Sequence, residues 1–246
     1  MDQQTRHALK QDKFVDTTSH GLEWASENRK PLILWISIVV AIVLVVVLGA
    51  VIYSSRSDAA SAAFGAAMQT YQTPLAQPGE PVPPGAKTFS SAAERAKAAN
   101  TQFAAVADKY GMMPDGRTAQ YFAGLTYMES GQTQKAEDTL KKVADSWNSN
   151  LAALAKFALA ELYRGSNRDQ QAIDLYNQLA AKPTTTVPYG IAKLALADLY
   201  IAEGKQEEAK KVYADLKDKD PKDPAGMIAA QKLNTGGAAP RMNLPQ

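Results

Sequence analysis

The chain has 246 residues, of which 46% are hydrophobic and 21% charged, a composition typical of an ordinary globular protein. Its 27 basic and 25 acidic side chains are spread along the sequence, so it lacks the concentrated basic charge that nucleic-acid binding requires. Cysteine is absent, which excludes disulfides, thiolate metal sites and cysteine nucleophiles.

The first predicted element is a membrane span over residues 32–53. This stretch, LILWISIVVAIVLVVVLGAVIY, carries no charge and would rise about 33 Å as a helix, enough to cross a hydrocarbon core about 30 Å thick. Trp35 and Tyr53 lie near its two ends, where aromatic rings favour the headgroup region. A cleaved signal peptide is the main rival, but its apolar part is only about 7–15 residues long. We expect the span to be retained.

Basic residues beside the span predict its orientation. Lys13, Arg29 and Lys30 precede it, whereas only Arg56 follows closely, and such a bias favours a cytoplasmic N-terminus. We therefore expect residues 1–31 to form a cytoplasmic tail. The chain after Tyr53 would then lie in the periplasm, and the protein would cross a bacterial inner membrane once.

Three segments in the second half of the chain share one spacing of small residues, tyrosines and turn residues. Equivalent positions are 36 residues apart (124 to 160) and then 37 (160 to 197). The pattern predicts antiparallel helix pairs, in which the small residues allow close approach, the tyrosine fills the space above them, and glycine or asparagine forms the turn. The three sets are Gly124, Tyr127, Gly131, Ala136 and Leu140; Ala160, Tyr163, Asn167, Ala172 and Tyr176; and Ala197, Tyr200, Gly204, Ala209 and Tyr213.

A fourth, incomplete copy is predicted upstream of these three. Ala99 and Phe103 precede Ala136 and Leu140 by 37 residues (136 − 99), so residues 91–110 are expected to form a second helix. Residues 78–88, PGEPVPPGAKT, cannot supply the first helix because they are rich in proline and glycine. We expect residues 57–71 to take that place, with a proline-rich loop inserted at 72–90.

The remaining expectations concern the end of the chain and the extent of the repeat domain. Residues 224–233 are predicted to form a short helix that caps the last pair, because a terminal repeat would otherwise expose its apolar face. We expect the repeat domain to cover residues 54–234 and residues 235–246 to be a disordered tail. The predicted fold is therefore all-α, with one transmembrane helix followed by an α-solenoid of three to four helix pairs.

The spacing resembles the tetratricopeptide repeat, although Gln120, Lys156 and Lys193 stand where that repeat has tryptophan and the steps exceed its usual 34 residues. The whole outline, with a short tail, one span and divergent repeats, is similar to the YfgM-like ancillary subunits of the bacterial SecYEG translocon. That resemblance implies an inner-membrane protein whose periplasmic repeat domain contacts translocon subunits and periplasmic chaperones.

The sequence predicts no enzyme, cofactor or metal site. The two histidines, His7 and His20, both precede the span, so the repeat domain lacks the commonest catalytic side chain. No nucleophile-elbow, phosphate-loop or HExxH motif occurs. The expected partners are other proteins, including translocon subunits, chaperones or client segments, together with membrane lipid around residues 32–53; neither nucleic acid nor a small-molecule substrate is expected.

A partner-binding groove is predicted on the first helix of each pair, the helix that lines the concave face in the tetratricopeptide arrangement. The predicted groove residues are Tyr121, Leu125, Met128, Phe157, Glu161, Arg164 and Asp198; the same register adds Thr118, Leu154, Ile191, Leu194 and Ile201. A simpler interpretation stays open, in which the apolar side chains pack between neighbouring first helices and Glu161 pairs with Arg164. The expected function is a membrane-anchored protein-interaction module that assists secretion or periplasmic folding, and the alternative is a structural scaffold of a membrane, division or envelope complex.

Overall fold

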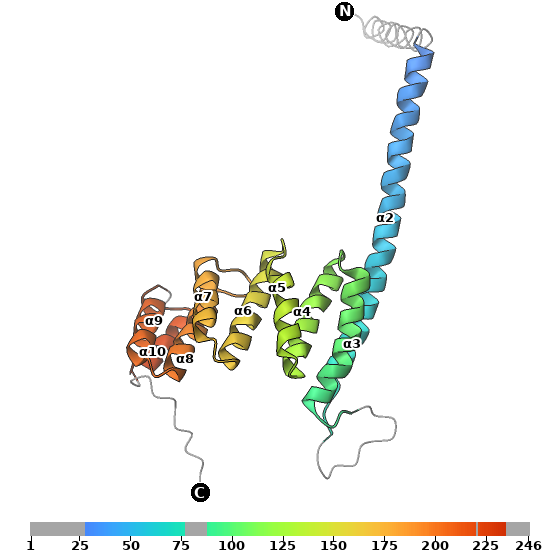
Figure 1. Cartoon of the computed structure of the whole chain (residues 1–246). Helices are drawn as coiled ribbons and strands as arrows, with labels where there is room; N and C mark the ends of the chain where they lie inside the picture. The colour runs from blue at the N-terminus through green and yellow to red at the C-terminus, as the bar shows by residue number, and fades with distance from the viewer. Residues whose placement is uncertain (1–27, 77–87, 220, 235–246) are drawn as a thin grey trace, which may run out of the picture. The chain divides into compact units, whose positions relative to one another are not determined.

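The computed structural model describes residues 28–76, 88–219 and 221–234. These residues form α-helices and no strands, apart from one isolated bridge between Leu75 and Phe89 (Figure 1). The chain divides into two compact units, Met1–Arg56 and Ser57–Gln246. The all-α prediction is confirmed. The helices are α2 (Arg29–Tyr71), α3 (Ala92–Tyr110), α4 (Pro114–Glu129), α5 (Thr133–Ala144), α6 (Ser149–Gly165), α7 (Asp169–Ala181), α8 (Tyr189–Ala202), α9 (Gln206–Lys219) and α10 (Pro224–Asn234).

The first unit contains the apolar part of α2, which is long and apolar enough to cross a membrane. Its large side chains from Ile33 to Tyr53 are exposed. The helix continues without interruption through the predicted end of the span to Tyr71.

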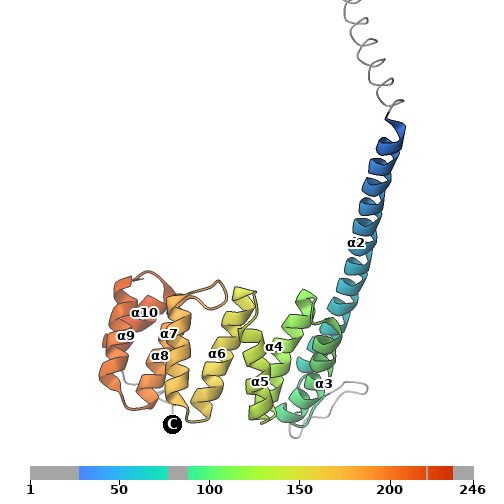
Figure 2. The ribbon, with the colours of Figure 1, turned by 45° about the horizontal axis from the view of Figure 1, so that its top comes forward.

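The second unit is a row of antiparallel helices in which each helix packs against the next (Figures 1 and 2). The last part of α2 packs against α3, where the ring of Phe103 lies 5.8 Å from Phe64 and 6.1 Å from Tyr71, centroid to centroid. Three further pairs follow, α4 with α5, α6 with α7 and α8 with α9, and α10 packs against α9 and α8. Some predictions fall outside the described residues. They concern residues 1–27, the middle of the proline-rich segment (77–87) and the tail 235–246.

The turn inside each pair has the same geometry in all three repeats. Gly131, Asn167 and Gly204 adopt φ values of 75°, 58° and 76°, and Asn167 is the only residue other than glycine with positive φ in the described chain. In each turn the tyrosine carbonyl four residues earlier accepts the N–H of the residue after the turn residue, over 2.8, 2.9 and 2.8 Å. This is the Schellman arrangement that ends a helix, and it explains why tyrosine and turn residue keep a fixed offset.

Small residues set the distance between the helices of each pair. Ala136, Ala172 and Ala209 are completely buried, as are Ala160 and Ala197 on the facing helices. In the first pair the contact is tighter still, because a Cβ added to Gly124 would lie 2.6 Å from Cδ2 of Leu140. Close approach of the helices therefore depends on the residues that the repeat spacing singled out.

Candidate partner-binding groove

Contacts between alternate helices involve first helices or the capping helix, and not second helices. They join α4 to α6 and α8 to α10, whereas comparable contacts between α6 and α8, or between α3, α5, α7 and α9, are not seen in the described chain. In a curved row of helix pairs, the layer whose helices approach each other is the inner one. The inner layer therefore consists of α4, α6, α8 and the capping helix α10.

The predicted groove residues lie on one stripe of each inner helix, because three- and four-residue steps repeat on one helix face. All of them are partly or fully exposed. The other side of each inner helix is buried against its pair, through Gly124, Ala160 and Ala197 among others. The stripe thus remains accessible along three successive repeats. It comprises Thr118, Tyr121, Leu125 and Met128 on α4, Leu154, Phe157, Glu161 and Arg164 on α6, and Ile191, Leu194, Asp198 and Ile201 on α8.

The apolar members of the stripe also pack against the core. Tyr121, Leu125, Met128, Phe157 and Leu194 contact the main buried cluster while keeping part of their surface exposed. The ring of Phe157, for example, meets that of Tyr176 edge to face at 5.7 Å. These side chains therefore contribute to the core and also keep apolar surface exposed.

Tyrosines of the second helices hold the acidic groups of the stripe. The Tyr176 hydroxyl donates a hydrogen bond to Glu161, and the Tyr213 hydroxyl donates to Asp198 over 3.3 Å. Burial, strengthened by the neighbouring carboxylate, raises the pKa of Tyr176 and raises that of Tyr213 to about 12. The hydroxyls therefore stay protonated donors at physiological pH and fix the two carboxylates.

The sequence analysis did not predict these tyrosine–carboxylate hydrogen bonds, although the spacing of the repeats contains a pattern that matches them. The two repeats with a tyrosine at the second-helix position, Tyr176 and Tyr213, have an acid 15 residues earlier (176 − 161 and 213 − 198). The first repeat has leucine at both places, Leu125 and Leu140. Arg164, the remaining charged member of the stripe, lies 3.7 Å from Glu161 (Nη1 to Oε2), and both side chains are more than one-third exposed.

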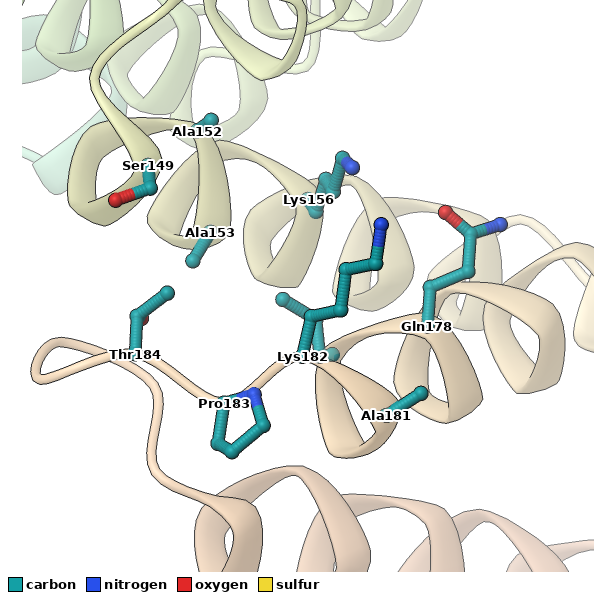
Figure 3. Close-up of a pocket in the computed structure, with 10 residues that line it drawn as sticks. Ser149, Ala152, Ala153, Lys156, Gln178, Ala181, Lys182, Pro183 and Thr184 are labelled. Atoms are coloured by element: carbon teal, nitrogen blue, oxygen red, sulfur yellow. The ribbon is translucent and has the colours of Figure 1, made fainter.

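A separate pocket lies between the start of α6 and the end of α7 (Figure 3). Its volume is about 440 Å³, and the ammonium groups of Lys156 and Lys182 lie on its rim while no acidic residue lines it. The connection from α7 to α8 forms one wall and is held in place by a 2.7 Å hydrogen bond from Thr186 Oγ1 to the Asn150 carbonyl. The repeat pattern did not predict this pocket, because it depends on the conformation of a connection that varies in length between repeats.

The chemistry that these residues offer is noncovalent. The stripe combines apolar side chains with one exposed ion pair and two hydrogen-bonded carboxylates, which are groups that recognise a partner. No set of three or more His, Cys, Asp or Glu side chains that could hold a metal ion occurs among the residues that the structure describes. His7 and His20 lie outside those residues.

Comparison with known proteins gives matches to tetratricopeptide-like repeats. The sequence model described as "Tetratricopeptide repeat-like domain" matches residues 23–235. Among solved structures, two crystal structures of the nearly identical TPR-like repeats of a putative kinesin light chain from Podosopora anserina, one of them carrying a single substitution, are similar to this chain, with identities of 19% and 20%. Each match covers 58% of this chain and 77% of the other chain, with a TM-score of 0.48. No curated protein matches the sequence.

Proposed function

Because the chain belongs to the tetratricopeptide repeat-like domain family, we propose that it is a membrane-anchored protein-interaction module whose inner helices bind a segment of a partner protein. The observation that carries this proposal is the stripe of accessible side chains that recurs on α4, α6 and α8. The partner segment is an extended or helical peptide with apolar side chains, because the stripe offers apolar contacts at Tyr121, Phe157 and Leu194.

Recognition in this groove uses a few strong contacts within a more adaptable surface. Tyr121 and Arg164 belong to the residue types that contribute most to protein interfaces. Met128 is flexible and polarisable, which suits partners of varied sequence. Glu161 and Asp198 are held by tyrosines in the free protein, so a partner that hydrogen-bonds to them loses little entropy in ordering them.

The location follows from the anchor. The apolar segment of α2 is proposed to be a retained span in a bacterial inner membrane, with the N-terminus in the cytoplasm and the repeats in the periplasm. The basic residues before the span and the resemblance to YfgM-like translocon subunits support this placement. The partners would then be translocon subunits, periplasmic chaperones or client segments. Protease added to spheroplasts should digest the repeats, and protection until the inner membrane is lysed would contradict the orientation.

Photocrosslinking in intact membranes tests the groove. A photoreactive phenylalanine analogue at Met128 is expected to capture partner proteins, and the same analogue at Lys142, exposed on α5, is expected to capture far less. Tyr121→Ala combined with Arg164→Ala should abolish the Met128 crosslinks while circular dichroism remains unchanged. The matched control is Lys142→Ala with Asn177→Ala, which removes two exposed side chains from the second helices.

The alternative scaffold function predicts a different pattern. A scaffold that does not recognise peptide would give crosslinks from Lys142 or from the span, and the double change in the groove would leave them intact. Partners that are still captured by the folded Tyr121→Ala/Arg164→Ala variant would therefore exclude the groove as the binding surface.

A further inference from the structure

Among the described residues of the second unit, the two most exposed large hydrophobic side chains lie at turns between helix pairs. Met112, between α3 and α4, is 83% exposed, and Trp147, between α5 and α6, is 81% exposed. Tryptophan is usually well buried in soluble domains, so an exposed one calls for an explanation. Neither residue belongs to the groove stripe.

Arg117 at the start of α4 joins these two residues into one patch. Its Nη2 donates a hydrogen bond to the Met112 carbonyl over 3.3 Å, and its guanidinium carbon lies 4.8 Å from the centroid of the Trp147 ring. We call Met112, Arg117 and Trp147 the turn patch. The bond from Arg117 to the turn and its contact with one ring face hold the patch in position, while the indole and the thioether remain exposed.

The turn patch lies at the edge of the repeats where the chain enters them. Ser61 on α2 donates a hydrogen bond to Asp115, which is two residues before Arg117. The chain between Tyr53, the last residue of the apolar segment, and Ser61 spans roughly eight residues and cannot exceed about 28 Å even when extended. An anchored chain therefore keeps this edge within reach of the membrane surface, whatever the arrangement of the two units.

We propose that the turn patch docks on the surface of the membrane that holds the anchor, with Trp147 and Met112 in the headgroup region. This proposal rests on the proposed membrane anchor. The patch consists of side chains at turns and not of a cleft, so it is suited to entering a soft interface and not to enclosing a peptide. Tryptophan prefers the membrane interface because its ring is apolar and its N–H needs a polar partner.

The charges around the turn patch indicate which lipid it fits. The two turns carry Arg117 and Lys109 against Asp108, Asp115 and Asp145, so they have no excess of basic charge. Docking therefore depends on the apolar side chains, and we expect it on vesicles of zwitterionic phosphatidylcholine with little dependence on salt. A strong requirement for anionic lipid would contradict this assignment.

Tryptophan fluorescence of the full chain in phosphatidylcholine vesicles tests the proposal. The chain has three tryptophans, so Trp24→Phe with Trp35→Phe leaves Trp147 as the reporter. Brominated phosphatidylcholine quenches only indoles that reach the bilayer, and acrylamide quenches those in water. Trp147 should be quenched severalfold more strongly by brominated lipid than a tryptophan placed by Ser166→Trp in a chain that has no other tryptophan. Ser166 is exposed at the other end of α6, a helix about 25 Å long.

The quenching results distinguish a failure of the docking proposal from a failure of the proposed membrane anchor. A chain that retains only Trp35 reports the anchor, because this residue lies in the apolar segment of α2. Quenching of Trp35 but not Trp147 by brominated lipid would overturn the docking and leave the anchor intact. Shielding of Trp147 from both quenchers would also overturn it, since a protein or a second copy would then cover the patch. Loss of Trp35 quenching would overturn the anchor and the docking together.

Discussion

Contacts within helix pairs and contacts between them follow different rules in this protein. Within each pair the alanine, the facing small residue and the left-handed turn recur in all three copies. Between pairs, one equivalent position of the second helix is filled in three ways, by Asn100, Glu137 and Ile173, spaced by 37 (137 − 100) and 36 (173 − 137) residues. The pairs thus share one backbone geometry, whereas the junctions between them use an amide, a carboxylate and an apolar side chain at the same position.

The three junctions use different interactions at this position. Asn100 Nδ2 donates to the Ala123 carbonyl at 2.9 Å and to Thr126 Oγ1 at 3.0 Å. Glu137 is only 7% exposed, and all its partners but Lys141 come from the next pair. Ile173 is buried in the main apolar cluster. Asn100 and Glu137 thus have the hydrogen-bond partners that a buried polar or charged side chain requires, and Ile173 needs none.

The largest loss of stability is expected at the junction that contains Ile173. Ile173→Ala removes buried methyl groups and leaves a cavity between α7 and its neighbours, which should lower the free energy of unfolding by about 2–5 kcal/mol. Urea unfolding of the full chain in detergent, followed by circular dichroism, measures this change. Gln171→Ala, exposed on the same helix, is the control and should be nearly neutral. Equal effects of the two changes would mean that α7 makes no close junction.

A smaller loss is expected when a pair interior is overpacked. Ala172 is completely buried, so Ala172→Leu should cost about 1–3 kcal/mol. Ala136→Leu and Ala209→Leu should give similar losses, because the three positions are equivalent, whereas Asn177→Leu on the exposed side of α7 should not. Thermal unfolding of the four variants measures these losses. Widely different losses at the three alanines would show that the pairs are not built alike.

Features within helix pairs could be predicted from the sequence, whereas most contacts between pairs could not. Turn residues, buried alanines and the pairing of helices recur at a fixed step, so their spacing predicted the repeats and, through the register, an accessible stripe on the inner helices. The tyrosine bonds to Glu161 and Asp198, the Glu137 cluster and the pocket near Lys156 were not predicted. The Glu137 contacts and the pocket depend on neighbouring helix pairs or on one connection, which the repeat spacing does not encode. The bonds to Glu161 and Asp198 follow a 15-residue spacing of acid and tyrosine that only two of the three repeats share.

The stability of the junction at Glu137 is expected to depend on pH. The hydrogen bond from Arg168 over 2.8 Å, with those from Lys141 and Tyr163, lowers the pKa of Glu137 to about 2 from its usual 4.5. A lowered folded-state pKa gives stability that is present above the unfolded pKa and is lost as pH falls through the folded pKa. The thermal midpoint should therefore decline between about pH 5 and pH 2.

Glu137→Gln isolates that contribution. It keeps the side-chain shape but removes the charge, and we expect a loss of about 1–2 kcal/mol at neutral pH, because Arg168 and Lys141 are partly solvated. The variant should show less decline with acid than the natural chain. An unchanged acid dependence in the variant would show that other carboxylates cause it.

The smallest effect concerns the left-handed turns, where a substitution acts on the backbone and not on packing. Gly204 has a φ of 76° and a Cβ there would meet no atom within 4 Å, so Gly204→Ala should cost about 1 kcal/mol through backbone strain alone. Asn167, with a φ of 58°, already accepts that conformation, so Asn167→Gly should change stability by a few tenths of a kcal/mol at most. Thermal unfolding of both variants compares them directly. A loss at Asn167 that matches or exceeds the loss at Gly204 would mean that the asparagine side chain makes a contribution that the turn geometry does not explain.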